Sequence, residues 1–309
     1  MTHAPALLPP SSLPLAHLAC AASMLVWAAG LPAADLLIPH VPAITLTAAR
    51  MGLATMVLLP LWLMIDGRRA VLGAAWGTGL LIGAVTCLGA FGLILGQARS
   101  DAVTVAIVSA AMPIVGMGIE VVFDGRRITP ALVLGMGLSL LGGLIALEGG
   151  GDAAGGGTLL GALLCLASVV VFTFGSRLTV TAFPGLSPLG RTTITLCGGA
   201  LTAGVMAALA TLTGLPAPNW SALGATEAGA LLIYAFAGLA LSQLLWIVSV
   251  GRLGIGLASL HINATPFYVM LILFAVGGPW LWHQVLGAAL VALGVMVAQG
   301  LLHPARARG

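Results

Sequence analysis

Long apolar runs, separated by short polar or proline- and glycine-containing stretches, fill the chain from residue 15 to residue 302. Each run is close to the roughly 20 residues that a helix needs to cross the hydrocarbon core of a bilayer. Helices are favoured over barrel strands because the runs are long and uniformly apolar, and because a backbone in lipid must satisfy its own hydrogen bonds. The pattern therefore predicts an all-α integral membrane protein with ten transmembrane helices. The predicted helices cover residues 15–31, 42–65, 72–95, 102–123, 130–147, 158–180, 188–212, 227–249, 255–275 and 282–302.

The composition agrees with a lipid environment. Hydrophobic residues make up 60% of the chain and charged residues 6%, with a mean hydropathy of +1.15, whereas soluble domains carry roughly 25% charged residues. The net charge of +3 comes without a basic patch interleaved with aromatic residues, so nucleic-acid binding is not expected. The four cysteines lie scattered within predicted helices, which indicates packing rather than a disulfide or metal framework, and no cofactor is expected.

Two stretches of the chain resemble each other. Pro113 and Pro266 lie 153 positions apart, and the pair Gly135 and Gly142 matches the pair Gly287 and Gly294 at a spacing of 152. If each copy belongs to a unit of five helices, the second unit enters the bilayer from the opposite side. This is the inverted-repeat design of many secondary transporters.

The repeat divides the chain into two halves of five helices each. The first five-helix repeat is expected at 15–148 and the second at 158–302, joined by a flexible, glycine-rich external linker at 149–157. Residues 1–14 are expected to form a disordered N-terminus and residues 303–309 a tail. Both termini are predicted to be cytoplasmic, because this orientation places most loop arginines on the cytoplasmic side. Those arginines are Arg68, Arg69, Arg126, Arg127, Arg177, Arg252, Arg306 and Arg308, against Arg99 alone outside.

Several residues of the first half recur at places typical of one transporter family. They are Trp27 to Gly30 in the first helix, Arg50 in the second, Pro113 and the loop Asp124 to Thr129 around the fourth, and Gly135 and Gly142 in the fifth. With them the chain resembles a ten-helix member of the drug/metabolite transporter superfamily with two EamA-type repeats, nearest in character to the aromatic amino-acid exporters (YddG-like). The family loop usually has a glutamate at the position of Asp124, so no role is carried over to that acid.

The ninth helix contains the strongest candidates for a substrate pathway. His261, Thr265 and Tyr268 are spaced to share one face of an α-helix, and Asn263 lies on an adjoining face. A histidine within a membrane helix is costly unless it faces water or a partner, which makes it a functional candidate. The alternative is a neutral imidazole hydrogen-bonded to a neighbouring helix.

The fourth helix carries candidates for gating. Ser109 and Glu120 share a stripe with Pro113, which is expected to kink the helix, as Pro266 is in the ninth. Such breaks mark central sites in many transporters. Glu120 is a candidate for gating or proton coupling, or it extends toward the loop arginines.

Aromatic residues outside the helix ends suggest a cavity for a ring-bearing molecule. Trp27, Trp246, Phe172 and Tyr268 are the candidates, and Tyr234 and Gln243 lie on the same predicted helix as Trp246. Arg50 and Arg191, inside the second and seventh helices, could each bind a carboxylate. The family resemblance places those helices off the central cavity, which favours a packing role for both arginines.

These features predict a non-enzymatic exporter of the inner (plasma) membrane. Small amphipathic metabolites, with amino acids including aromatic ones as leading candidates, would cross by alternating access through a central cavity. The expected partners are this small-molecule substrate and the lipid bilayer, and the protein is expected to function as a monomer. Alternatives are a proton-coupled exporter of drugs or cations, a membrane enzyme acting on a lipid, and a channel.

Overall fold

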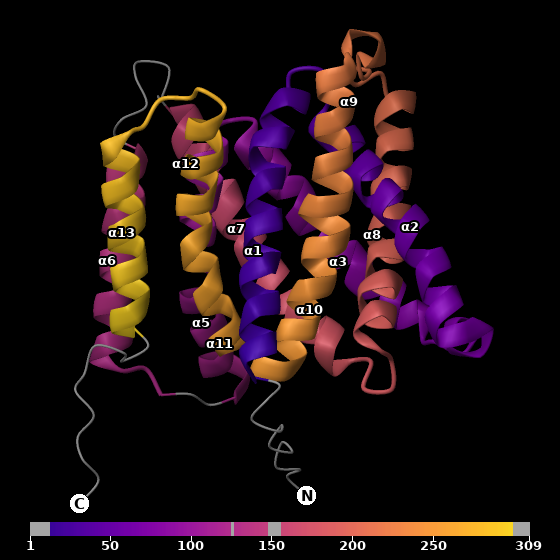
Figure 1. Ribbon diagram of the computed structural model, residues 1–309, viewed down its shortest axis with the longest axis horizontal. Helices are drawn as coiled ribbons and strands as arrows, with labels where there is room; N and C mark the ends of the chain where they lie inside the picture. The colour runs from indigo at the N-terminus through magenta and orange to yellow at the C-terminus, as the bar shows by residue number, and fades with distance from the viewer. Residues whose placement is uncertain (1–12, 125–126, 148–155, 299–309) are drawn as a thin grey trace, which may run out of the picture.

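The described helices overlap each of the ranges expected from hydrophobicity, and the expected fourth and ninth helices are each divided into shorter segments. The computed structural model describes residues 13–124, 127–147 and 156–298. They form a bundle of nearly upright helices (Figure 1). The elements are α1 (Leu13–Leu37), α2 (Ala43–Leu72), α3 (Trp76–Gln97), α4 (Ala102–Ser109), α5 (Met112–Asp124), α6 (Pro130–Leu147), α7 (Gly156–Thr181), α8 (Pro188–Leu212), the 3-10 helix η3 (Trp220–Ala222), α9 (Ala225–Leu232), the π-helix η4 (Ile233–Leu241), α10 (Ser242–Leu253), α11 (Ile255–Ser259), the 3-10 helix η5 (Leu260–Ala264), α12 (Thr265–Ala275) and α13 (Trp282–Ala298).

Length and composition confirm a multi-pass membrane protein. Seven helical segments within the described ranges are long and apolar enough to cross a bilayer, and three shorter apolar helices accompany them. The shorter ones are Pro130–Ile145, Leu260–Ala275 and Trp282–Ala298. Residues 1–12, 148–155 and 299–309, which include most of the predicted N-terminus and linker and the whole tail, lie outside the described residues.

The two copies of the repeat have the same pattern of helix starts. α4 and α11 begin at residues 102 and 255, α5 and α12 at 112 and 265, and α6 and α13 at 130 and 282. Pro113 and Pro266 are each the second residue of a helix that follows a break. Proline is tolerated in a first turn because its missing N–H has no helical acceptor there. The prolines therefore start new helical segments rather than bend continuous ones.

Glycines bring α6 and α13 into direct backbone contact, in an antiparallel arrangement that Figure 1 shows at one side of the bundle. A Cβ atom at Gly142 would lie 2.7 Å from the carbonyl oxygen of Gly287, and one at Gly135 would collide with that of Gly294. In sequence Gly135 corresponds to Gly287 and Gly142 to Gly294. A contact that exchanges the equivalent residues is what a two-fold axis in the membrane plane requires, so this geometry agrees with an inverted repeat.

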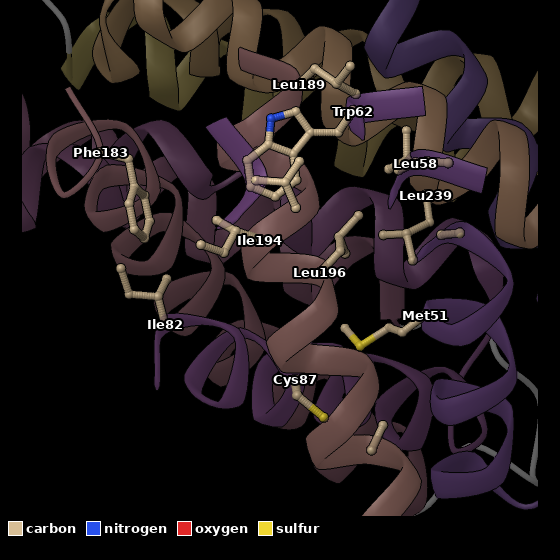
Figure 2. Close-up of a cluster of buried hydrophobic side chains, with 14 residues drawn as sticks. Met51, Leu58, Trp62, Ile82, Cys87, Phe183, Leu189, Ile194, Leu196 and Leu239 are labelled. Carbon is tan, nitrogen blue, oxygen red and sulfur yellow. The ribbon is translucent and has the colours of Figure 1, made fainter. Parts of the chain in front are cut away.

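At the opposite side of the bundle, α2, α3 and α8 enclose a large apolar cluster. Gly83 of α3 lies against Gly198 and Gly199 of α8, so close that a Cβ atom would collide with their backbone. Figure 2 shows side chains of this apolar cluster, in which Trp62 of α2 and Ile194 of α8 are fully buried. Close backbone approach at small residues is the usual way that membrane helices pack.

Candidate functional site

A cavity of about 110 Å³ lies at the centre of the bundle. Helices of both halves contribute to its wall: α1 to α5 in the first half, and α7, α8, η4, α10 and η5 in the second. The wall combines three aromatic side chains, three methionines and a series of hydroxyl groups. The hydroxyl-bearing residues are Ser23, Thr86, Ser109, Ser168, Ser176, Thr179, Thr195 and Ser242.

Trp27, Phe172 and Trp246 supply the aromatic part of the wall. The rings of Phe172 and Trp246 have centroids 6.1 Å apart and are tilted by 36°. The indole nitrogen Nε1 of Trp246 donates to Oγ of Ser176 at 3.1 Å, which fixes a ring that is only 2% exposed. Two of the rings come from α7 and α10 of the second half and one from α1 of the first.

The hydroxyl groups mostly bond to their own helices. Oγ of Ser168 donates to the carbonyl of Leu164, and Oγ1 of Thr179 to that of Gly175, each one turn earlier. Oγ of Ser109 differs, because it is buried without a hydrogen-bond partner among the described residues. It is thus available to a polar group within the cavity. Gln243 of α10 adds an amide to the same wall.

Arg50 is the one charged side chain in the wall among the residues that the structure describes. Its Nε donates to the carbonyl of Tyr234 at 3.2 Å, Nη1 to the hydroxyl of Tyr234 at 3.1 Å, and Nη2 to the carbonyl of Gly238 at 2.7 Å. The guanidinium also lies 4.0 Å from the centroid of the Tyr234 ring. These bonds hold the guanidinium of Arg50, a residue that is 5% exposed, against the π-helix η4.

The expectation that Arg50 lies off the central cavity is wrong. Its bonds to backbone carbonyls agree with the expected packing role, but Arg50 is also part of the cavity wall. Gly30 of α1 lies against Gly238, where a Cβ atom on Gly30 would be 3.1 Å from Cα of Gly238. Arg191 does stay outside the described wall, and donates to the carbonyls of Leu186 and Pro184 in the loop before its helix.

The ten predicted pathway residues fall into two groups. Trp27, Ser109, Phe172, Gln243 and Trp246 lie together in the cavity wall. Tyr234, His261, Asn263, Thr265 and Tyr268 are not part of the described wall. Tyr234 is 1% exposed and lies behind Arg50.

The expected face of the ninth helix does not form, because residues 260–264 adopt a 3-10 helix. With about three residues per turn, the α-helical spacing from His261 to Thr265 no longer aligns their side chains. His261 instead stacks on His17 of α1, with ring centroids 5.2 Å apart and Nε2 lying 3.2 Å from Nδ1 of His17. The helical spacing around His261 gives no indication of this contact, because His17 belongs to a helix 244 residues earlier in the chain.

The two proline candidates for gating lie next to the cavity rather than in its wall. Pro113 and Pro266 are not among the described lining residues, whereas Met112 and Ile262, beside the two breaks, are. Ile262 is the repeat equivalent of Ser109, so the two breaks present one polar and one apolar side chain to the same space. The side chain of Glu120 lies outside the described part of the structure.

A signal for the hydroxyl-lined face was present in the sequence. Ser168, Phe172, Ser176 and Thr179 recur at intervals of four, four and three residues, which is the spacing of one helix face. All four line the cavity.

Comparison with known proteins assigns part of the chain to a family. Residues 14–147 match the model of the EamA-like transporter family. The chain contains an EamA-like transporter domain. The recognition of this family from the motifs of the first half is thereby confirmed.

Individual proteins also resemble the chain. The uncharacterized transporter YyaM of Bacillus subtilis (strain 168) is 34% identical over 120 residues, which cover 38% of this chain and 37% of that protein. The match therefore spans well under half of the length of this relative. A crystal structure of another protein covers 96% of this chain and 99% of its own, with a TM-score of 0.70 and 20% identity. This likeness shows that the two proteins share a fold over nearly the whole of this chain.

Proposed function

We propose that this protein is a membrane transporter that carries small amphipathic metabolites through the central cavity. The observation that carries the proposal is the wall of that cavity, to which both halves contribute aromatic rings and hydroxyl groups. A site between two symmetric halves can be exposed to either side of a membrane as the halves rock. The EamA-like transporter domain and the transporter name of the Bacillus relative support the same function.

Amino acids, including aromatic ones, are the proposed cargo. The rings of Trp27, Phe172 and Trp246 suit an apolar or aromatic side chain, while Ser109 and Gln243 offer hydrogen bonds to a polar head. The proposed direction is export across the inner membrane by a monomer with both termini in the cytoplasm.

The breaks before Pro113 and Pro266 are the proposed gates. Each break separates two helical segments that can tilt independently, and each places a residue, Met112 or Ile262, in the cavity wall. Alternating access would require the two breaks to open toward opposite membrane faces in turn.

A proton-coupled exporter of cationic drugs is the weaker candidate. Such a carrier would favour a carboxylate beside the bound cation. Among the described residues, the charge that reaches the wall is the positive charge of Arg50. Repulsion by this guanidinium disfavours a cationic cargo.

Reconstitution into liposomes tests the proposed function. The liposomes are preloaded with labelled phenylalanine, other amino acids, a sugar or a cationic drug, and efflux is measured with and without a pH gradient. We expect amino-acid efflux above that of protein-free liposomes. Efflux of the cationic drug alone, dependent on the pH gradient, would overturn the amino-acid assignment.

A further inference from the structure

We propose that Arg50 binds a carboxylate of the cargo, so that the cavity selects molecules with a carboxylate head and an apolar or aromatic body. The inference rests on the proposed transport function and assigns the chemical class of its substrate. Its starting point is Arg50, a residue that is 5% exposed and yet is part of the cavity wall.

The charge of Arg50 has no counter-ion within the described part of the chain. Its partners are two backbone carbonyls and one neutral phenol, which together occupy three of the five N–H donors of a guanidinium. Asp35 of α1 is engaged elsewhere, where it accepts hydrogen bonds from Nε2 of Gln97 at 2.8 Å and from the backbone N of Ala102 at 3.3 Å. A buried cation without an acid is costly, and an anionic ligand would remove that cost.

The two remaining donors of Arg50 lie on Nη1 and Nη2, because each of these nitrogens carries two hydrogens and uses one. Two donors on neighbouring nitrogens match the two oxygens of a carboxylate. The buried hydroxyl of Ser109, without a described partner, offers a further hydrogen bond in the same cavity.

The aromatic wall completes the recognition of such a molecule. Phe172 and Trp246 form a ring pair in the wall that contains Arg50. A carboxylate held by the guanidinium would leave the rest of the molecule beside apolar surfaces. An amine without a carboxylate would meet the repulsion of Arg50 and leave its donors unsatisfied.

Binding to the purified full-length protein tests this inference with three compounds that share one phenyl ring. Phenylalanine carries a carboxylate and an ammonium group, 3-phenylpropionate only the carboxylate, and phenethylamine only the ammonium group. Binding is preferable to flux here because 3-phenylpropionate and phenethylamine cross lipid in their neutral forms. We expect both carboxylates to bind and phenethylamine to bind at least about tenfold more weakly, which is the effect of losing hydrogen bonds to a charged group.

Variants separate recognition by Arg50 from its packing role. Arg50→Gln should weaken binding of both carboxylates by about tenfold or more while leaving phenethylamine unchanged or tighter. Arg50→Lys keeps the positive charge but cannot form two parallel hydrogen bonds to a carboxylate. Its affinity for the two carboxylates should therefore fall between those of the wild type and Arg50→Gln. Arg191→Gln is the matched control, because Arg191 is the repeat equivalent that bonds to a loop away from the described wall.

The outcomes distinguish this inference from the proposed function. Equal binding of phenethylamine and 3-phenylpropionate, binding of none of the three compounds, or an equal loss of all ligands in Arg50→Gln would each overturn the carboxylate assignment. Transport in liposomes could still stand in those cases. Carboxylate binding that depends on Arg50, together with no efflux of any cargo, would support the assignment and remove the transport function.

Discussion

At the scale of single residues, polar side chains in this protein find their partners mainly on helix backbones. Oγ of Ser23 donates to the carbonyl of Ser242 at 2.7 Å, and Oγ of Ser249 to that of Leu245 at 2.7 Å. Nε2 of Gln97 joins α3 to the carbonyl of Leu31 at 2.7 Å. In hydrocarbon an unsatisfied group is expensive, so each bond of this kind restricts how its helix can rotate.

Ser176 provides a residue-scale prediction. Ser176→Ala leaves the buried indole N–H of Trp246 without the acceptor that it has at 3.1 Å, which should lower the free energy of unfolding by about 1–3 kcal/mol. Denaturant titration in detergent micelles measures the loss. Thr181→Ala on the same helix is the control, because Thr181 is exposed and bonds to its own helix, and its effect should stay within about 0.5 kcal/mol. Equal losses in both variants would contradict the described role of Ser176.

At this scale, the sequence was sufficient to select several of the residues that line the cavity, but not to predict how each side chain lies. Trp27, Phe172 and Trp246 could be selected because aromatic residues away from helix ends need another reason than interfacial anchoring. The place of Arg50 in the cavity wall could not be predicted, because the arginine bonds to the backbone of the π-helix η4. The apolar sequence of residues 233–241 does not distinguish a π-helix from an α-helix. His261 was expected on an α-helical face, and a 3-10 turn removes that face.

At the scale of elements, small residues set the distance between helices. The antiparallel pair α6 and α13 meets at Gly135 and Gly294 and again at Gly142 and Gly287. The positions of the helices could be predicted from apolar length, since each needs enough residues to cross the bilayer. The break from Leu260 to Ala264 could not, because Pro266 indicates that a helix starts nearby but not how the preceding turn winds.

Neighbouring glycines of α6 allow a matched prediction. Gly142→Ala would place a Cβ atom 2.7 Å from backbone atoms of Gly287 and Val291, whereas a Cβ atom at Gly143 meets nothing within 4 Å. The free energy of unfolding should fall by about 1–3 kcal/mol in Gly142→Ala. It should be unchanged or rise by up to about 1 kcal/mol in Gly143→Ala, because alanine favours the helix. Indistinguishable stabilities in detergent would argue against this helix contact.

At the scale of the whole molecule, the two halves that carry the repeat enclose a wall that is not symmetric. Ser109 and Ile262 occupy equivalent positions at the two breaks but differ in polarity, and Arg50 faces the cavity while Arg191 does not. The repeat can account for the two proposed gates, because both copies contain a helix break. Recognition of a substrate requires side chains that differ between the copies. The proposed direction of insertion rests separately on the loop arginines.

The predicted orientation is testable with single cysteines. Arg68 and Arg99 are both exposed and lie at the ends of α2 and α3. In a cysteine-free background and intact cells, a membrane-impermeant maleimide should label Arg99→Cys and spare Arg68→Cys until the cells are opened. The opposite labelling pattern would reverse the assignment of both termini to the cytoplasm.

The central claim is that cargo passes through the cavity between the halves. Ala90 of α3 lines this cavity, whereas Leu88 on the same helix is 55% exposed on the outer surface. Efflux of labelled phenylalanine from liposomes should be abolished by Ala90→Trp, because the indole fills the cavity, and should persist in Leu88→Trp. If Ala90→Trp folds as well as Leu88→Trp and still releases phenylalanine at the wild-type rate, the cavity is not the pathway.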